Sequence, residues 1–357
     1  MSEKHNKNIH TNNGLYKSNK VLIIVSISLI VVLTGLYIVF GRESEEESVW
    51  KYQSFDYFDT ITEVMVYDSV PADEEEALKA FIDEKLDYYH KLFDIYHTYE
   101  GLNNIKTIND NAGANPIEVP EELSTLIDEA KLLHIETEGK LNIALGSVLN
   151  IWHLYRDEGI KVPPVGELVK AAAYTDISKI QVKGNFVLIN MKGMSIDLGG
   201  IGKGYAAELL SQDLEEHGIK NALISLGGNI VAVGDKNGKK YTVGIEDPEN
   251  EGTSKVILKI GNLSAVTSGD YQRFYEVDGK RYCHIIDPES LYPQEYYRSV
   301  TVIAKSSLLA DAMATALFNM DPMTAYEYVN SDDRIEAMWI MKDGTVNYSE
   351  GFRKYIK

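Results

Sequence analysis

The stretch SIDLGGIGKGYAAELL, residues 195–210, sets the expected fold around the candidate site. It has a strand-like apolar start, four glycines between positions 199 and 204, one lysine and then a helical run. We therefore expect a strand that ends at Asp197, a glycine turn, and a helix that begins near Lys203. Free N–H groups at a helix start, glycines that permit close approach and one ammonium group would together hold a phosphate. The alternative is a tight turn in which glycine supplies only unusual backbone angles.

Two familiar phosphate-binding patterns do not match this stretch. The P-loop pattern needs a glycine, four further residues, and then Gly-Lys followed by Ser or Thr. Asp197 and Gly204 occupy the two end positions of that pattern around Gly202-Lys203. The glycines at 200, 202 and 204 are also too evenly spaced for the dinucleotide-binding fingerprint. Neither pattern therefore explains the stretch.

The composition is that of a globular protein. The chain has 357 residues, of which 44% are hydrophobic and 25% are charged, so it could hold one large domain or two ordinary ones. A formal net charge of -19 argues against nucleic acid as a partner, because a polyanion-binding surface needs clustered lysine and arginine. Cys283 is the single cysteine, so no internal disulfide can form and the core alone must stabilise the fold.

Residues 21–40, VLIIVSISLIVVLTGLYIVF, form an apolar segment without a single charge. This is about the length that a helix needs to cross a bilayer. A buried core helix is the alternative, although such helices rarely lack any charge over this length. We predict a short cytoplasmic tail at 1–20, a transmembrane anchor at 21–40, an acidic linker at 41–50 and an extracytoplasmic domain at 51–357.

Charges around the apolar segment give its expected orientation. Lys17 and Lys20 precede it, and the acidic run GRESEEES at 41–48 follows it. By the positive-inside rule, the N-terminus is cytoplasmic and the bulk of the chain lies outside. No A-x-A-like cleavage site follows the segment, and Cys283 lies far from it. These features favour a retained, single-pass anchor in the cell membrane over a cleaved signal or a lipidated N-terminus.

The remaining chain predicts an α+β fold with mixed or antiparallel sheets and packed helices. Strands are expected at 59–68, in a hairpin at 179–190, in two pieces across 221–234 joined by Gly227-Gly228, in four short runs between 255 and 286, and at 299–305. Helices are expected at 73–96, about 121–138 and 307–320, with an asparagine-rich loop at 107–116. Helices lie among hairpins rather than in strict βαβ alternation, which indicates the α+β class.

The predicted helix at 307–320 carries a candidate oxygen site. Asp311 and Thr315 are one helical turn apart, so they share a face that is otherwise apolar. A carboxylate with a hydroxyl one turn later is a sparse ligand set that Mg²⁺ accepts when phosphates and waters complete its shell. In the alternative interpretation, Thr315 bonds its own helix backbone and Asp311 caps the helix or faces solvent.

Two further stretches carry candidate residues. In VTSGDYQRFYEVDGKRYCHIIDP, residues 266–288, two β runs flank a turn, and the polar candidates include Ser268, His284 and Asp287. A lone histidine in a strand is more often a hydrogen-bonded structural residue than a catalytic one. The stretch LNIALGSVLNIW, residues 141–152, is mostly apolar and could be core or a slot for a flat ring.

Together these stretches resemble the FAD:protein FMN transferases, the ApbE-type family. The resemblance extends from about Tyr57 to Phe318 and includes YFDTITEVMVY, ALISLGGNIVAVG and SVTVIAKSSLLADAMATALF. It is carried by six pieces in the family's order, at compatible spacing. It implies an ApbE-like, T-fold-related domain and a Mg²⁺-dependent enzyme with FAD as its substrate. The FMN half of FAD would move to a Thr or Ser hydroxyl of an acceptor flavoprotein, which forms a phosphodiester and releases AMP.

The resemblance also implies roles for individual positions. Asp311 and Thr315 match metal-binding positions, and Gly200 matches a third that could serve only through its backbone carbonyl. His284 fits the histidine of the family's H-I-x-D-P motif and is the candidate base for the acceptor hydroxyl, with Asp287 as the residue that orients it. The residues expected to contact FAD are Phe58, Tyr96, Leu141, Asn142, Ile143, Asp197, Lys203, Ser268 and Ile285.

Three positions depart from the family's pattern. Phe58-Asp59-Thr60 stands where many members have Met-Gly-Thr. Leu291 stands where glycine is common, so the turn that contains it is expected to differ. Ala314 replaces a carboxylate that some members use for the metal, which leaves fewer charged ligands.

Other functions stay open on the sequence alone. With water in place of the acceptor hydroxyl, the same site would hydrolyse FAD to FMN and AMP. A non-catalytic surface protein that retains FAD would be stably yellow and would release no AMP. A solute-binding receptor would leave the Asp311 and Thr315 pair without a purpose.

Overall fold

The computed structural model describes residues 49–236 and 238–357. The predicted tail at 1–20, the anchor at 21–40 and nearly all of the linker at 41–50 lie outside these residues. None of the helices in the described part combines the length and the apolar composition that a membrane crossing needs. Strand β1 (Trp50–Ser54) begins one residue before the predicted start of the domain.

The described chain divides into a large unit, residues 49–245 and 257–357, and a short segment, 246–256. In the short segment, the Asp247 carboxylate accepts hydrogen bonds from the Glu249 amide (3.1 Å) and from Asn250 Nδ2 (3.0 Å). These bonds close a turn within the segment. The large unit contains every residue predicted for the functional site.

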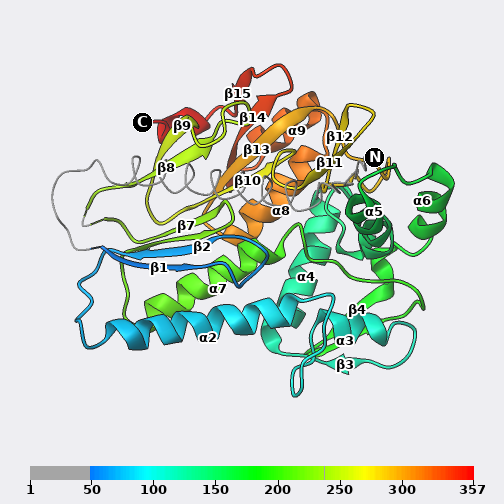
Figure 1. The fold of residues 1–357 in the computed structure, drawn as a ribbon, viewed down its shortest axis with the longest axis horizontal. Coiled ribbons are helices and arrows are strands. Elements are labelled where there is room, and N and C mark those ends of the chain that lie inside the picture. Colours follow the sequence, from blue (N-terminus) through cyan, green and yellow to red (C-terminus); the bar gives the residue numbers. More distant parts are fainter. Residues whose placement is uncertain (1–48, 237) are drawn as a thin grey trace, which may run out of the picture. The chain divides into compact units, whose positions relative to one another are not determined.

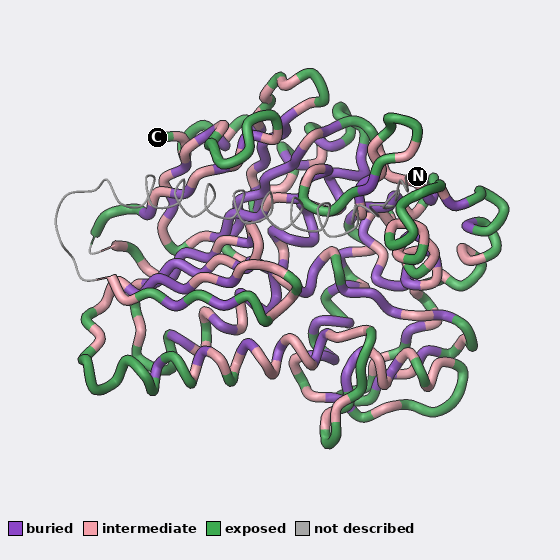
Figure 2. The backbone as a smooth tube through the Cα atoms, viewed as in Figure 1, coloured by how far each residue is buried: buried purple, intermediate pink, exposed green. Residues whose placement is uncertain are grey.

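The large unit is built on an eight-stranded sheet (Figure 1). Every neighbouring pair in the order β1-β2-β6-β7-β10-β13-β14-β15 is antiparallel, so the predicted α+β class with mixed or antiparallel sheets is confirmed in its antiparallel form. In β13, seven of eight residues are buried, and Figure 2 shows that buried residues predominate in the central strands of the sheet. Beyond β1, the strands of this sheet are β2 (Thr62–Val66), β6 (Ala222–Leu226), β7 (Asn229–Val233), β10 (Ser264–Gly269), β13 (Tyr297–Ala304), β14 (Ile335–Met341) and β15 (Val346–Tyr348).

Four of the helices that share one hydrophobic core with this sheet pack on it or on one another. Helix α7 packs on β6 and β7, α8 packs on β10 and β13, α9 packs on β14, and α2 packs on α7 (Figure 1). The helix α8 is nearly all apolar and buried, which explains why it can lie between the sheet and α7. The bounds of the four helices are α2 (Glu75–Phe93), α7 (Gly202–Glu216), α8 (Ser307–Phe318) and α9 (Pro322–Ser331).

Smaller elements complete the described fold. A three-stranded sheet has the order β3-β5-β4, and two hairpins pair β8 with β9 and β11 with β12. The strands are β3 (Ile117–Glu118), β4 (Ile180–Lys183), β5 (Phe186–Ile189), β8 (Tyr241–Glu246), β9 (Ser254–Ile260), β11 (Phe274–Val277) and β12 (Lys280–Cys283). The helices are α3 (Ile105–Asp110), α4 (Glu121–Glu136), α5 (Gly146–Glu158), α6 (Val165–Ala172), η1 (Ile143–Leu145), η2 (Ile177–Lys179) and η3 (Phe352–Tyr355).

Trp152 forms a second hydrophobic core between α5 and the β11–β12 hairpin. Its ring lies against Tyr275, Tyr282 and Tyr292, and its indole N–H donates to the Leu291 carbonyl at 3.0 Å. Residues 141–152 were expected to be either core or a slot for a flat ring. Trp152 is only 3% exposed and therefore belongs to the core.

Most elements expected from the sequence are confirmed, including the helices at α2, α4 and α8, the hairpins β4–β5 and β6–β7, and four strands between 254 and 283. The prediction of an asparagine-rich loop at 107–116 is wrong at its start, because α3 extends to Asp110. Asn104 explains the difference: its side chain accepts from the Thr107 amide, and the Thr107 hydroxyl accepts from the Asn104 amide in a capping box.

The predicted strand that ends at Asp197 is also wrong, since residues 194–198 belong to no sheet. The Ile196 amide donates to Asn109 Oδ1 at 2.7 Å, and Asn109 Nδ2 donates to the Ile196 carbonyl at 2.9 Å. The Asp197 amide donates to the Ile143 carbonyl at 2.8 Å. The Asn109 side chain and the Ile143 carbonyl thus take the place of the hydrogen bonds that a neighbouring strand would make.

Two glycines with similar φ angles give a test of the packing between Thr60, which precedes β2, and the β6–β7 turn. Gly227 has φ 57°, and a Cβ there would lie 2.1 Å from the Thr60 hydroxyl, whereas Gly184 has φ 55° and open space around it. Both Gly→Ala variants should lose about 1–2 kcal/mol of unfolding free energy to the left-handed conformation. Gly227→Ala should lose about 1–3 kcal/mol more to the clash, measured by urea unfolding. Equal losses in the two variants would contradict the packing described.

Candidate active site

Helices α7 and α8 meet at Gly204 and Asp311. The Gly204 amide donates a hydrogen bond to Asp311 Oδ2 at 2.7 Å. A Cβ at Gly204 would lie 2.4 Å from the Asp311 Cβ and 2.5 Å from the Ser307 carbonyl oxygen. Only glycine therefore allows this approach, and the contact fixes one carboxylate oxygen of Asp311 against the first turn of α7.

Thr315 and Gly200 meet one helical turn further along α8. The Thr315 hydroxyl donates to the Gly200 carbonyl at 3.2 Å, and a Cβ at Gly200 would lie 3.0 Å from Thr315 Cγ2. The alternative in which Thr315 bonds its own helix backbone does not hold in this structure. The fold thus brings together the three residues predicted for the metal, Gly200, Asp311 and Thr315.

The oxygen atoms of this group fit a divalent cation. Asp311 is 4% exposed and, among the described residues, has no Lys, Arg or His within ion-pair distance and no donor to Oδ1. A buried carboxylate without a cation is costly, and a bound metal ion would remove that cost. Carboxylate, hydroxyl and carbonyl oxygens are also the ligands that Mg²⁺ prefers. Residues 49–236 and 238–357 contain no group of three or more His, Cys, Asp and Glu side chains that could hold a metal. The Asp311 set would therefore need oxygen ligands from a substrate or water.

Helix α7 begins at Gly202, one residue from its predicted start, and presents part of its backbone to the site. The Gly199 amide donates to Asp197 Oδ1 at 2.7 Å and the Gly204 amide donates to Asp311, so these two N–H groups are engaged. Within the described chain, the Gly200 and Lys203 amides have no acceptor, and the Lys203 ammonium has no carboxylate partner. Two N–H groups and one cation thus remain for an anion at this turn.

Glu208 fixes the start of α8 relative to α7. Its Oε2 accepts from the Ser306 hydroxyl at 2.7 Å and from the Leu308 amide at 3.0 Å. Ser306 in turn caps α8 by accepting from the Leu309 amide at 3.1 Å. This capping holds the helix that carries Asp311 in register with the glycine turn.

His284 lies just after β12 and is held in one orientation. Its Nδ1 lies 3.2 Å from the Arg273 carbonyl oxygen, which can only accept, so Nδ1 carries the proton. Burial, together with the nearby Lys203 and Arg273 cations, lowers the pKa of His284 to about 3. The imidazole is therefore neutral at physiological pH, with Nε2 available as a proton acceptor.

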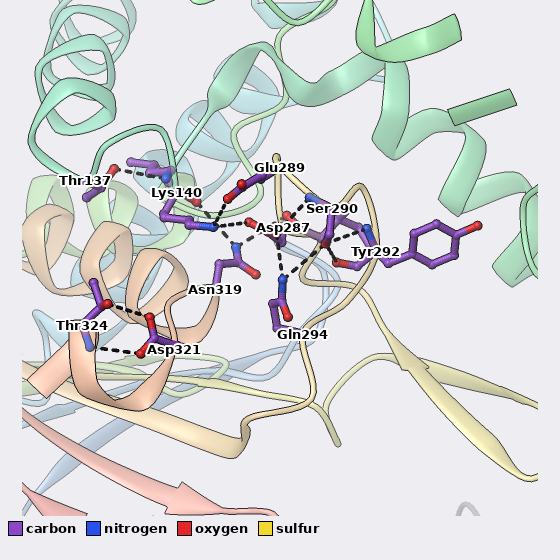
Figure 3. Close-up of polar contacts among 12 residues, drawn as sticks. Thr137, Lys140, Asp287, Glu289, Ser290, Tyr292, Gln294, Asn319, Asp321 and Thr324 are labelled. Atoms are coloured by element: carbon purple, nitrogen blue, oxygen red, sulfur yellow. Dashed lines mark hydrogen bonds and ion pairs between the residues drawn. The ribbon is translucent and has the colours of Figure 1, made fainter. Parts of the chain in front are cut away.

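Asp287 does not orient His284, which corrects the role predicted for it. Its carboxylate accepts from Lys140 Nζ (3.0 Å), Gln294 Nε2 (2.8 Å) and the Ser290 amide (3.0 Å), as Figure 3 shows. These bonds lower the pKa of Asp287 although its burial opposes the shift. Asp287 is 1% exposed and stabilises the turn that follows the H-I-x-D-P motif.

Two of the departures from the family's pattern keep the backbone that glycine would allow. Leu291 has φ 63° and its amide donates to the Asp287 carbonyl at 2.8 Å, so this turn holds a non-glycine residue in the left-handed conformation. Its side chain is buried in the core around Trp152. Phe58 and Asp59 have φ 57° and 51°, so the first turn also adopts a left-handed backbone with two non-glycine residues.

Tyr96 lies on a turn that the Asp94 carboxylate holds, by accepting from the Tyr96 amide at 2.6 Å. The Tyr96 ring is 56% exposed, and its hydroxyl lies 3.4 Å from His153 Nδ1. Burial and the charge of Asp197 raise the pKa of the Tyr96 phenol, and Ile95, the residue before Tyr96, lines the same cavity as Asp197. Tyr96, Asp197 and His153 therefore form one part of the site.

A cavity of about 480 Å³ adjoins Asp197. Its lining residues come from the connection after α2, from α3 and α5, and from the loop before α7, and include Ile95, Asn109, Gly146, Ser195 and Asp197. The volume is within the range of small-molecule sites. The Ser195 hydroxyl is buried there without a hydrogen-bond partner.

Other predicted FAD contacts have engaged or buried side chains. Leu141, Ile143 and Ile285 are at most 6% exposed and belong to the main core, so only their backbones could face a ligand. The Asn142 side chain caps η1 through the Ala144 amide (2.9 Å) and donates to the Thr175 carbonyl (3.1 Å). Ser268 is 8% exposed on β10.

Sequence reasoning missed His153, Arg156 and Arg273. The Arg156 and Arg273 charges contribute to the lowered pKa of His284, and neither guanidinium has a carboxylate partner among the residues described. His153 and Arg156 follow directly on the apolar run 141–152, one helical turn apart. In the sequence, Asp157 and Glu158 directly follow Arg156, and Asp270 and Glu276 flank Arg273, so no local pattern marks these cations as functional.

Comparisons with known proteins agree with this geometry. The ApbE family model matches residues 58–339. The chain is 31% identical over 310 residues to the FAD:protein FMN transferase of Treponema pallidum, which covers 82% of this chain and 84% of the relative. It is 28% identical over 330 residues to a Vibrio cholerae protein of the same name, with coverages of 91% and 96%.

Solved structures give the same result. The crystal structure of the ApbE protein from Thermotoga maritima superimposes with a TM-score of 0.77 and 27% identity, covering 87% of this chain and 100% of that one. The flavin transferase ApbE from Vibrio cholerae gives 0.75 and 26%, with coverages of 86% and 99%. The chain belongs to the ApbE family.

The charge around His284 gives a prediction for its titration. Because the Lys203 ammonium disfavours the imidazolium, Lys203→Gln should raise the pKa of His284 from about 3 toward the ordinary value near 6.5. Nitrogen-15 NMR of selectively labelled histidines in the full chain would follow this titration, with His284→Ala to assign the signal. Lys79→Gln, on the exposed side of α2, is the control and should change nothing. An unshifted His284 in Lys203→Gln would contradict the proximity of the two residues.

Proposed function

We propose that this protein is an FAD:protein FMN transferase that moves the FMN half of FAD onto a Thr or Ser hydroxyl of an acceptor flavoprotein. The main observation in support is the group formed by Asp311, Thr315 and the Gly200 carbonyl, which lies beside the turn that contains Lys203. Family membership and the names of the curated relatives support the activity. AMP is the second product.

Lys203 and the free amides at the start of α7 would bind the diphosphate of FAD. One ammonium and two N–H groups at a helix start match a doubly charged anion. Tyr96 supplies an exposed aromatic face, and the cavity beside Asp197 could receive part of a flat ring system. We place FAD across these features, with the diphosphate near Gly200.

The residues present fit a Mg²⁺ ion held by Asp311, Thr315 and the Gly200 carbonyl. When bound, Mg²⁺ would neutralise diphosphate charge, which is the main requirement of phosphoryl chemistry. Ala314 is fully buried on α8 and adds no ligand, so phosphate oxygens and water complete the shell in this proposal.

His284 would act as the general base. Its Nε2 accepts the proton of the acceptor hydroxyl, and the hydroxyl oxygen forms a bond to the phosphorus of the FMN half. The bond from that phosphorus to the bridging oxygen breaks, and AMP leaves with this oxygen. Lys203 stabilises the charge that develops on the departing phosphate. A general base contributes about 10² to 10⁴ in rate.

We further propose that the enzyme is held at the cell membrane by a single pass at residues 21–40, with residues 51–357 outside the cytoplasm. The uncharged segment, the lysines before it and the acidic run after it support this arrangement. The acceptor would then be a flavoprotein that faces the same side of the membrane.

One assay tests the proposed activity. The full chain in detergent is incubated with FAD, Mg²⁺ and a membrane extract of cells that encode it, and proteins are scored by in-gel flavin fluorescence and by mass. The proposal expects a protein that carries an FMN-sized adduct on Thr or Ser, with release of AMP. Free FMN without an adduct would indicate hydrolysis instead, and unchanged FAD would indicate binding alone.

Asp311→Asn tests the metal site without a change in side-chain volume. The amide oxygen can still accept from the Gly204 amide, so stability should hold, whereas loss of the charge should reduce Mg²⁺-dependent transfer by about 10²-fold or more. Asp321→Asn is the matched control, because Asp321 caps α9 through the Met323 and Thr324 amides. Full activity of Asp311→Asn, at any Mg²⁺ concentration, would contradict the proposed site.

A further inference from the structure

The turn at Tyr57–Thr60 is strained and yet closely held. Phe58 and Asp59 both have left-handed backbones, with φ 57° and 51°. The Thr60 amide closes the turn by donating to the Tyr57 carbonyl at 3.3 Å. Non-glycine residues keep such conformations only where the surrounding structure over-determines them, which is typical of functional sites.

Two side chains bond the backbone of this turn. His90 Nδ1 accepts from the Phe58 amide at 3.1 Å, and the His90 ring meets the Phe58 ring edge-on. On the other side, one Arg273 nitrogen donates to the Phe58 carbonyl at 3.3 Å and to the Asp59 carbonyl at 3.1 Å. Both carbonyls of the strained turn therefore accept from a single guanidinium.

The main chain of Arg273 holds His284. The Arg273 carbonyl accepts from the His284 amide at 3.0 Å and lies 3.2 Å from His284 Nδ1. The second of these bonds selects the tautomer with a free Nε2. Arg273 thus bonds the turn that carries Phe58 through its side chain and the candidate base through its backbone.

The Arg273 guanidinium has no carboxylate partner in the described part of the chain, and its residue is exposed. A surface arginine of purely structural use would more commonly pair with an acid, and this chain has 54 Asp and Glu residues. Its two hydrogen bonds instead go to neutral carbonyls of a turn expected to contact the substrate.

We propose that Arg273 is a positioning residue, which links the Phe58 turn to His284 so that FAD binding and alignment of the base depend on each other. This inference rests on the proposed function and adds the element that connects its binding and proton-transfer steps. Arg273 itself need not touch the reacting atoms. Its removal frees the turn and loosens the loop whose carbonyl sets the His284 ring.

The test uses full-length Arg273→Gln, His284→Ala and the double variant. Arg353→Gln is the control, because Arg353 is an exposed arginine whose guanidinium lies over Tyr348. FAD affinity is measured by flavin fluorescence in EDTA without an acceptor, and FMN transfer is measured at saturating FAD. Arg273→Gln should bind FAD about tenfold more weakly or worse, the size expected for lost hydrogen bonds from a charged donor.

The transfer rates distinguish positioning from stabilisation. Arg273→Gln should lower kcat about tenfold or more, because small displacements of a catalytic group are costly. In the His284→Ala background, Arg273→Gln should cause no further loss of kcat while its loss of FAD affinity persists. Arg273→Lys, which keeps the charge but places its ammonium on a shorter side chain, should fall between wild type and Arg273→Gln.

Several results would overturn the proposal. If Arg273→Gln binds FAD as tightly as wild type, Arg273 does not position the Phe58 turn for FAD. If the kcat losses of Arg273→Gln and His284→Ala are additive, Arg273 does not act through the base. Thermal melts show whether each variant is folded. If Arg273→Gln does not fold, the same measurements are made on Arg273→Lys and are judged by the same criteria.

Failure of the proposed function would be seen separately. If the wild-type chain transfers no FMN, that function fails, whereas FAD affinity and the nitrogen-15 shifts of His284 still test Arg273. Wild type should then show one His284 tautomer, and Arg273→Gln should show exchange between two. A single, unchanged tautomer in Arg273→Gln would overturn the inference.

Discussion

The site depends on the contact of a glycine in one helix with an aspartate in the next. Gly204 has no side chain, so α8 can approach α7 closely enough for the Gly204 amide to hold Asp311 Oδ2 at 2.7 Å. The same approach lets Thr315, one turn later, reach the Gly200 carbonyl. The eight-stranded sheet and the apolar faces of α7 and α8 fix the two helices in this position. Any larger residue at position 204 would separate the oxygen ligands before it affected the rest of the core.

Within residues 49–236 and 238–357, the charged side chains around the contact between Gly204 and Asp311 lack partners of opposite charge. The chain as a whole is strongly acidic, with a net charge of -19, yet Lys203, Arg156 and Arg273 have no acidic partners in the described chain. Asp311 shows the converse, as a buried carboxylate without a basic partner. A buried carboxylate without a cation is costly, whereas solvent-accessible cations without acidic partners leave a positive surface that attracts an anion. A divalent cation would pair with Asp311, and an anionic diphosphate would pair with the cations. The neutral state of His284 leaves its Nε2 free to accept a proton.

Patterns within single elements were predictable from the sequence. The α+β class, the main helices and hairpins, and the shared face of Asp311 and Thr315 follow from local periodicity and turn residues. Contacts between distant segments were not predictable. Asn109 removes residues 195–198 from any sheet, and Lys140 and Gln294 bind the carboxylate of Asp287, which was expected at His284. Arg273 was missed for the same reason, because its partners Phe58 and Asp59 are over 200 positions away. Leu291 shows a further limit, since a non-glycine residue there keeps a left-handed backbone.

The most direct test of the account is the position of a divalent cation on α8. Crystals of the protein grown with FAD and Mn²⁺ would be measured for the anomalous scattering of manganese. The account predicts one strong peak within coordination distance of the Asp311 carboxylate, the Thr315 hydroxyl and the Gly200 carbonyl, with the diphosphate of FAD beside Lys203. A well-ordered FAD whose diphosphate lies elsewhere, or a manganese peak on other side chains, would contradict it.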